Sequence, residues 1–302
     1  MNPRKANIFM LVLVLFQVIV MVILNFTDFP LAGNLVLSQA VVFLVPSAIF
    51  LIFFRGGEKV NSILKFKKMS GKNVALIIIM GFLVQPATMA IGAITSLFSE
   101  NILAEVMLEL TSLPFLGLLF VVAVVPSICE EIAFRGVVFK GYEKASMKKL
   151  IIVNGLFFGF MHGNFQQFFY TFLLGILIAL LVYYTGSMFS AMLFHFILNG
   201  SQVVLLSLVS FLEEFLESQG YALAEADTSS SPIVSWVIIG FIVLVATFGF
   251  IKVLKIFIKA NPLPEKTLDA KEKHSIATPS FVTVCVIYTL LMVFALVAPY
   301  LQ

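Results

Sequence analysis

The most chemically distinctive stretch of this sequence is 126–136, where two adjacent glutamates and an arginine interrupt a long apolar run. The glutamates are Glu130 and Glu131, and the arginine is Arg135. A charged side chain at bilayer depth is costly, so ionisable residues inside a membrane segment are functional-site candidates by default. We therefore expect this cluster to be the centre of the protein's chemistry.

Two further ionisable side chains, His162 and His195, lie within apolar runs and away from their ends. Counting from the nearest inner loop at about 1.5 Å per residue puts Glu130, His162 and His195 at depths of roughly 15, 19 and 13 Å. These depths are similar although the residues belong to three helices, so we predict one shared polar site. Asn199 follows His195 by four residues and shares its helix face.

A carboxylate, two imidazoles and an amide suit hydrolysis of an amide bond by an activated water molecule. Glu130 can act as the general base, and His162 can help to hold the water. His195 and Asn199 can donate hydrogen bonds to the developing oxyanion. No Ser or Cys nucleophile stands in an evident arrangement with a histidine.

Glu131 and Arg135 have the spacing of a supporting ion pair. They are four residues apart on one helix face, so each can cancel the other's charge in a low-dielectric setting. Glu130 is rotated by about 100° around the helix from Glu131 and can face another partner.

The same atoms also suggest a metal site, because Glu130, His162 and His195 are ligand types of catalytic zinc. However, the sequence contains no His-Glu-x-x-His motif and no short-range ligand pair. We favour a mechanism that requires no cofactor, with a divalent metal such as zinc on these three residues as the alternative.

The composition is that of a polytopic membrane protein. Of 302 residues, 61% are hydrophobic and 12% are charged, with a mean hydropathy of +1.08, whereas soluble proteins carry about 25% charged residues. The apolar runs have the length of spanning helices rather than of barrel strands. We predict one all-α integral membrane domain over 1–302, with its catalytic core helices at about 113–212. The nine predicted spans are 7–26, 33–54, 73–98, 113–139, 150–163, 167–184, 187–212, 232–254 and 280–300.

The charge distribution gives the predicted orientation. With the N-terminus inside, the inner segments are 1–6, 55–72, 140–149, 185–186 and 255–279. These segments, together with Lys252 beside the last of them, hold all of the 19 Lys and Arg residues except Arg135. The positive-inside rule therefore predicts a cytoplasmic N-terminus and an external C-terminus. The excess of lysine over arginine is typical of an AT-rich bacterial genome, so we expect a bacterial plasma membrane.

Three short motifs carry a family resemblance, and they occur in this order on three predicted helices: Glu130-Glu131-x-x-x-Arg135, Phe158-x-x-x-His162 and His195-x-x-x-Asn199. Together they resemble the CPBP family of CAAX prenyl protease 2 and bacteriocin-processing or abortive-infection proteins. The resemblance covers about 113–212, and the family has an eight-helix core, so the ninth span would be additional.

The resemblance implies an intramembrane endopeptidase with the site roles given above. Its substrate would be a hydrophobic or lipidated peptide or protein reached from the lipid bilayer, and nothing indicates nucleic acid. Family members are often labelled metalloproteases, while the glutamate–water mechanism needs no metal, so both versions stay open. Some bacterial relatives are linked to immunity against bacteriocins.

Two other classes of function use similar residues. Intramembrane Glu, Arg and His also build proton relays in transporters. Transporters often contain repeats and paired broken helices, whereas Pro46 and Pro86 are isolated and predict simple kinks. A non-catalytic immunity or scaffold protein is the other alternative, although a scaffold needs no such polar constellation.

A stripe of small residues, Gly155, Gly159 and Gly163, lies along the fifth predicted span. Such a stripe allows helices to approach closely. It either crowds backbones around His162 or serves ordinary helix packing.

Overall fold

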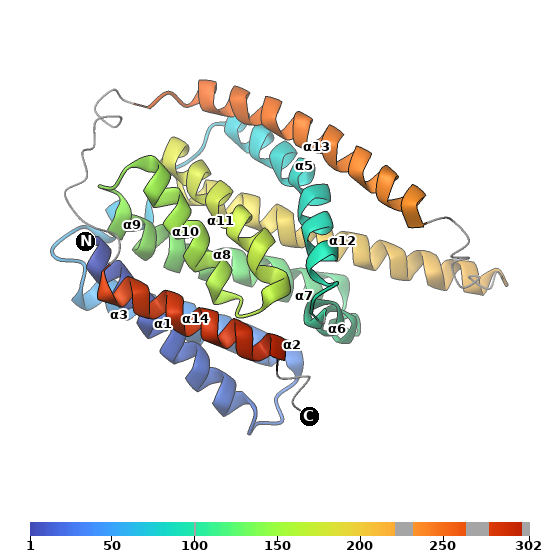
Figure 1. The fold of residues 1–302 in the computed structure, drawn as a ribbon, viewed down its shortest axis with the longest axis horizontal. Helices are drawn as coiled ribbons and strands as arrows, with labels where there is room; N and C mark the ends of the chain where they lie inside the picture. Colours follow the sequence, from blue (N-terminus) through green and yellow to red (C-terminus); the bar gives the residue numbers. More distant parts are fainter. Residues whose placement is uncertain (100, 221–231, 264–277, 298–302) are drawn as a thin grey trace.

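The fold is an all-helical bundle, seen here in a computed structural model that describes residues 1–99, 101–220, 232–263 and 278–297 (Figure 1). Three of the seventeen helical segments are π-helical and are labelled η1 to η3. The segments are α1 (Pro3–Leu24), α2 (Leu31–Gln39), η1 (Ala40–Leu44), α3 (Val45–Phe53), α4 (Val60–Leu64), α5 (Gly71–Thr95), α6 (Ile102–Leu110), α7 (Phe115–Leu119), η2 (Phe120–Val124), α8 (Val125–Glu131), η3 (Ile132–Val138), α9 (Phe139–Tyr142), α10 (Met147–Met161), α11 (Phe165–Thr185), α12 (Met188–Ser218), α13 (Pro232–Ala260) and α14 (Pro279–Val297).

Eight helices among the described residues are long and apolar enough to cross a membrane, which confirms the predicted polytopic bundle. Two of them are composite: α2, η1 and α3 form one continuous helix, and the segments from α7 to α9 form another. The remaining candidates are α1, α5, α11, α12, α13 and α14.

The fifth predicted span, 150–163, is the one of the nine that is not among these eight candidates; it forms α10, which has only 15 residues. Fifteen helical residues extend about 22 Å, whereas the hydrocarbon core is about 30 Å thick. This segment is therefore too short to cross a bilayer by itself. It turns back at Gly163, which has a φ of 62°, and forms a hairpin with α11.

Two glycines bring the backbones of α10 and α11 into contact. A Cβ atom on Gly155 would lie 2.7 Å from the carbonyl oxygen of Phe172, and one on Gly175 would lie 2.8 Å from Gly155 Cα. Neither position can hold a larger residue without moving a backbone. Of the two interpretations of the glycine stripe, close packing of α10 on α11 is the one that these contacts support.

The two composite helices share a local sequence, Val-Val-x-x-Val-Pro-Ser, at 41–47 and 121–127. In each, a π-helical turn lies directly before the proline, which is Pro46 in one helix and Pro126 in the other. Proline has no N–H and its ring crowds the carbonyl four residues earlier, so the preceding turn widens. Pro46 is therefore not an isolated feature, as the sequence suggested, but one member of a matched pair.

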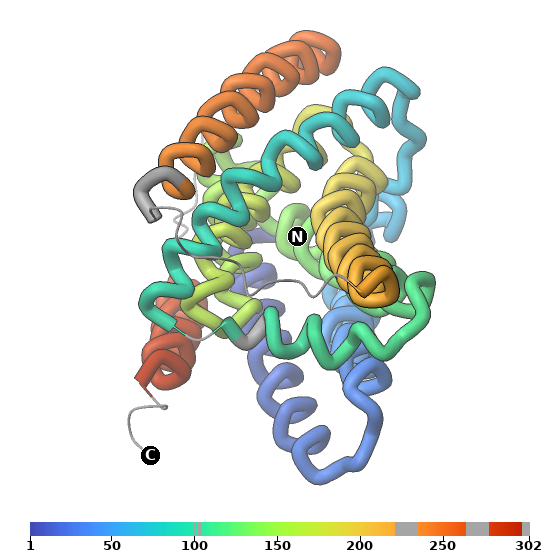
Figure 2. The backbone as a smooth tube through the Cα atoms, turned by 90° about the vertical axis from the view of Figure 1, so that its right-hand side faces the viewer, coloured from blue at the N-terminus to red at the C-terminus, as the bar shows by residue number. Residues whose placement is uncertain are grey.

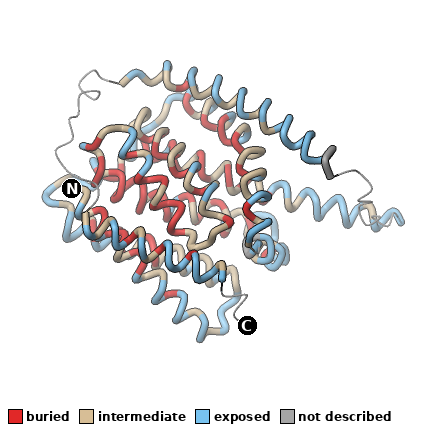
Figure 3. Tube along the Cα trace, viewed as in Figure 1, coloured by how far each residue is buried: buried red, intermediate tan, exposed pale blue. Residues whose placement is uncertain are grey.

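The most buried part of the bundle is the middle of the composite helix that contains α8 and η3 (Figure 3). Phe134, Arg135 and Val137 are completely inaccessible to solvent. This helix packs against α1, α10 and α12, and Arg135 also reaches Gly175 on α11. The motif 130–135 is thus enclosed by protein and not exposed to lipid.

Helices α13 and α14 lie at the outside of this core. Helix α13 packs along α5 (Figure 2). Most of its apolar residues are exposed. Helix α14 lies beside α1 and also contacts α10 and α11 (Figure 1). Exposed apolar faces of this kind suit contact with lipid, which is as apolar as the side chains themselves.

Helix α12 is longer than predicted. It continues past the expected end at residue 212 to Ser218. Glu213, Glu214 and Glu217, which the sequence assigns to an outer loop, therefore lie on its last turns and are exposed. The rest of that loop, 221–231, lies outside the described residues.

Two segments predicted for the inner side meet in a cluster of ion pairs. The Nζ atom of Lys140 lies 2.8 Å from an oxygen of Glu58 and 2.6 Å from an oxygen of Glu143. Lys65 also pairs with Glu143, and the amino group of Met1 lies 2.6 Å from Glu58. The cluster joins the α3–α4 connection to the end of α9.

The Lys140 ammonium, which hydrogen-bonds to the Glu58 carboxylate, lowers the pKa of that group from 4.5 to about 2. Because the folded-state pKa is the lower one, the stabilisation is present above pH 4.5 and is lost as the pH falls towards 2. We expect Glu58→Gln to lower the melting temperature in detergent near neutral pH, and the difference from the wild type to vanish at about pH 2. Glu213→Gln, at an exposed position on α12, is the control. A difference that persists unchanged into strong acid would contradict the role of this carboxylate.

Candidate active site

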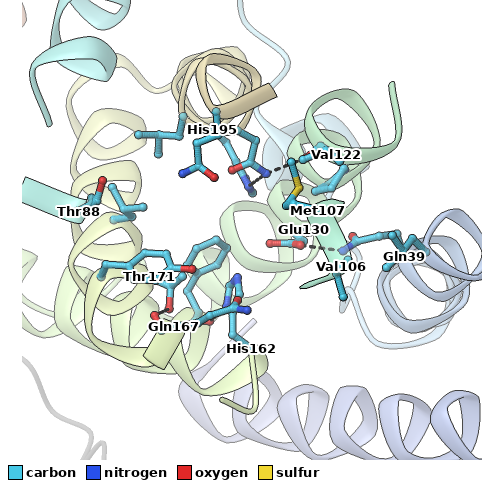
Figure 4. A pocket seen from close by; sticks show the side chains of 18 of the residues that line it. Gln39, Thr88, Val106, Met107, Val122, Glu130, His162, Gln167, Thr171 and His195 are labelled. Atoms are coloured by element: carbon cyan, nitrogen blue, oxygen red, sulfur yellow. Dashed lines mark hydrogen bonds between the residues drawn. The ribbon is translucent and has the colours of Figure 1, made fainter. Parts of the chain in front are cut away.

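Four of the predicted site residues line one cavity of about 190 Å³ in the interior of the bundle (Figure 4). They are Glu130 on α8, His162 at the end of α10, and His195 and Asn199 on α12. Glu130 and His195 are only 6% and 5% exposed. The structure thus brings side chains from three helices to one cavity.

Glu131 and Arg135 lie behind this cavity and form the predicted ion pair. Arg135 Nη1 lies 3.2 Å from Glu131 Oε2, and both side chains are fully buried. Arg135 Nη2 also donates to the carbonyl oxygen of Gly175 at 3.0 Å. The guanidinium group lies 4.6 Å from the centre of the Phe158 ring, within the range of a cation–π contact. The positive charge is thus held by a carboxylate, a carbonyl and an aromatic face.

Glu131 has a second partner that the sequence does not predict. Its Oε1 atom lies 2.8 Å from His195 Nδ1 on α12. A carboxylate at this distance accepts a hydrogen bond, so Nδ1 carries a proton and the other ring nitrogen, Nε2, is the one left for the site. One series of polar contacts thus runs from Arg135 on η3 through Glu131 to His195 at the cavity.

Asn199 is oriented by a carbonyl of the neighbouring composite helix. Its Nδ2 atom donates to the oxygen of Val122 at 2.9 Å and lies 3.4 Å from His195 Nε2. Pro126, four residues after Val122, has no N–H to donate to that carbonyl. The missing N–H of Pro126 thus accounts both for the π-helical turn before the proline and for the available carbonyl that orients Asn199.

The ring of Phe158 lies between the charged residues and the two histidines. Its centre is 5.1 Å from that of His162 and 5.7 Å from that of His195, both in edge-to-face geometry. His162 Nδ1 hydrogen-bonds to the carbonyl oxygen of Phe158 at 2.9 Å. Since a carbonyl only accepts, Nδ1 is the donor, and Nε2 of His162 is free to accept a hydrogen bond from water.

Gln39 is a site residue that sequence reasoning missed. It is the last residue of α2, and its Nε2 atom donates to Glu130 Oε1 at 2.9 Å (Figure 4). The signal in the sequence is an amide side chain inside the apolar run 33–54. This contact occupies one carboxylate oxygen of Glu130 and orients the other.

Glu130, His162 and Gln39 also line a second cavity of about 340 Å³. This cavity lies between α1, the α2–η1 segment and the end of α10, and most of its remaining lining is apolar. The carboxylate and the imidazole therefore stand where two cavities meet.

The alternative metal site is not favoured by this arrangement. Among the described residues, which include Glu130, His162 and His195, no group of three His, Cys, Asp or Glu side chains is placed to hold a metal ion. Nδ1 of each histidine is engaged, with a carbonyl or with Glu131, so Nε2 is the ring nitrogen that each leaves for the cavity. We derive no step through a metal.

Comparison with known families agrees with the three motifs. Residues 112–201 match the model of the family described as "Type II CAAX prenyl endopeptidase Rce1-like". This confirms the resemblance: the segment that is similar to this family carries all six predicted site residues. Comparisons with curated proteins and with solved structures gave no match.

The family implies a protease of the CAAX type, that is, a membrane-embedded peptide hydrolase. With eight helices long enough to span, the chain is an integral membrane protein. The match covers less than the first half of α12 and none of α1 to α6, α13 or α14.

Proposed function

We propose that this protein hydrolyses a peptide bond inside the membrane with a water molecule activated by Glu130. The observation that carries the proposal is the position of the Glu130 carboxylate, which faces His162, His195 and Asn199 across one buried cavity. Each of these groups is held by a hydrogen bond to another residue of the protein, so the site is preorganised before substrate enters.

The reaction begins when Glu130 takes a proton from water and the water oxygen bonds to the substrate carbonyl carbon. His162 Nε2 accepts the second hydrogen of the water and orients it. The oxyanion receives hydrogen bonds from Asn199 Nδ2 and His195 Nε2. Glu130 then passes its proton to the amide nitrogen, the carbon–nitrogen bond breaks, and an acid and an amine leave.

The role of His195 requires a proton on each ring nitrogen, because Nδ1 already donates to Glu131. The resulting imidazolium has its charge next to the Glu131 carboxylate on one side and the oxyanion on the other. Glu131 and Arg135 act through His195: the carboxylate orients the ring, and the guanidinium balances the carboxylate.

The two cavities that meet at Glu130 support cleavage within a chain and not only at its end. An endopeptidase must accommodate substrate on both sides of the bond that it cuts, and the amine and acid products must separate. Both cavities are lined largely by apolar side chains. We therefore propose a hydrophobic or lipidated peptide or protein as the substrate, reached from the bilayer.

The deciding experiment is a cleavage assay of the purified protein in liposomes, with a prenylated CAAX peptide and a pool of short hydrophobic peptides. We expect cleavage that survives a strong chelator, because the mechanism needs no cofactor. Loss of cleavage on chelation and recovery with zinc would assign Glu130, His162 and His195 to a metal. If folded protein cleaves nothing, a non-catalytic immunity or scaffold role, or a proton-coupled transporter, would replace the protease.

We also propose the orientation given by the charge distribution, with the N-terminus in the cytoplasm and the C-terminus outside a bacterial plasma membrane. It requires that α10 and the turn at Gly163 together carry the chain from the inner side to the outer end of α11, so that the chain crosses nine times. A reporter fused after residue 302 should be accessible only from the external side in whole cells. The same reporter fused within the basic loop 55–72 should be accessible only from the cytoplasm. Equal accessibility of both fusions from one side would contradict this orientation.

Gln39→Leu should reduce cleavage about fivefold to tenfold, since one hydrogen bond to the reacting carboxylate would be lost and its loss would leave Glu130 less well oriented. Ser38→Ala is the matched control, because Ser38 lines the second cavity but hydrogen-bonds only within its own helix, to Leu35. Initial rates at saturating peptide measure the effect. Equal rates for Gln39→Leu and the wild type would show that the contact is dispensable.

A further inference from the structure

Helix α14 lies outside the segment that matches the family, yet it reaches the end of the short helix that presents His162. We propose that Tyr288 on α14 and Gln17 on α1 form a brace that positions His162. The catalytic consequence of this brace rests on the proposed function, whereas the positioning itself does not.

Tyr288 is the outer member of the brace. Its side chain is completely buried, and its hydroxyl donates to Gln17 Oε1 at 3.3 Å and also contacts the sulfur of Met161. The Tyr288 ring stacks on Phe160, with the ring centres 5.6 Å apart and the planes inclined by 7°. One side chain of α14 thus contacts two consecutive residues at the end of α10.

Gln17 is the inner member. Its Nε2 atom donates to the backbone carbonyl of Met161 at 2.9 Å. The last four carbonyls of a helix lack partners within that helix, so Gln17 supplies a bond that α10 cannot make for itself. His162 is the next residue, and Gln17 lines the second cavity together with His162 and Glu130.

The need for a brace follows from where α10 ends. His162 lies just after the last helical residue, before the turn at Gly163. Its ring hydrogen bond goes to Phe158, one turn back on the same helix. That bond fixes the ring relative to α10, but it does not fix the end of α10 relative to Glu130 on α8. Contacts from other helices must do so, and Gln17 and Tyr288 provide them.

A matched control is available in Tyr142, a second fully buried tyrosine whose hydroxyl donates to an amide side chain of α1, that of Asn7. Tyr142 ends α9, near the Lys140 ion pairs and away from the cavities. Tyr288→Phe and Tyr142→Phe each remove one hydroxyl and leave the ring. Both should lower the melting temperature, but only Tyr288→Phe should affect His162.

The readout that does not depend on cleavage is the ring nitrogen NMR spectrum of protein labelled at histidine. The chain has three histidines, and His162→Gln and His195→Gln assign two of them. We expect the His162 signals to shift in Tyr288→Phe and in Gln17→Leu, while the His195 signals stay. Unchanged His162 signals in both variants, or the same shift in Tyr142→Phe, would overturn the proposal. This result stands even if the wild type cleaves no peptide.

The catalytic readout applies when the wild type is active. Tyr288→Phe and Gln17→Leu should each lower kcat about fivefold to tenfold, the factor that one lost hydrogen bond produces, and leave KM unchanged. The double variant should lose less than the product of the two single losses, because Tyr288 and Gln17 contact each other and both act on Met161. Additive losses, or a loss confined to KM, would contradict the brace.

Discussion

Glu130→Gln should abolish peptide cleavage and leave the fold intact. Glutamine keeps the shape of the side chain and can still accept the hydrogen bond from Gln39, but it cannot take a proton from water. Loss of a general base typically costs about 10²–10⁴ in rate. The measurement is the initial rate in liposomes, together with the melting temperature in detergent.

Glu213→Gln provides the control for this experiment, since it makes the same chemical change at an exposed position of α12. It should cleave at the wild-type rate. If Glu130→Gln retains more than about a tenth of wild-type activity, the loss is below the range for a general base and another group must activate the water. His162, the other ionisable side chain that lines both cavities, would be the next candidate.

The sequence predicts the site well because charge inside a membrane is so costly. Few ionisable residues fall within the apolar runs, and counting residues from the basic loops is enough to place Glu130, His162 and His195 at one depth. The Glu131–Arg135 pair follows from spacing on a single helix. These predictions depend only on distance along a helix axis, which follows directly from the number of residues between two positions.

Contacts between helices are harder to predict, because they depend on how each helix is rotated about its axis. The bond from His195 to Glu131 and the bond from Gln39 to Glu130 both join different helices. Neither residue spacing nor depth distinguishes them from other pairs at the same level. Gln39 is also uncharged, so it carries a smaller desolvation cost and a weaker signal than a carboxylate.

Local backbone effects explain the other differences. The run 150–163 has the composition of a span but is too short to be one. It forms α10, the short helix that ends next to His162 and packs on α11 as a hairpin. Pro46 is predicted to be an isolated kink, although it shares the local sequence Val-Val-x-x-Val-Pro-Ser with Pro126. The π-helical turns that precede them depend on how the chain relieves the proline ring, which packing decides.

Arg135→Ala should cause the largest loss of stability of any single change considered for this protein. Arg135 and Glu131 are both fully buried, and removing one partner of a buried ion pair typically costs about 3–5 kcal/mol of the free energy of unfolding. The carbonyl of Gly175 and the face of Phe158 would also lose their partner. Denaturant unfolding in detergent micelles measures the effect.

A second variant separates the uncompensated charge from lost packing. In the double variant Arg135→Met with Glu131→Gln, neither charge of this ion pair remains, and glutamine can still accept the hydrogen bond from His195. This protein should therefore be more stable than Arg135→Ala, although it has lost both charges. Equal losses in the two variants would mean that the uncompensated charge of Glu131 is not what destabilises Arg135→Ala. If Arg135→Ala has the same free energy of unfolding as the wild type, His195 alone neutralises Glu131. The ion pair would then be dispensable both for the fold and for the charge on the imidazole.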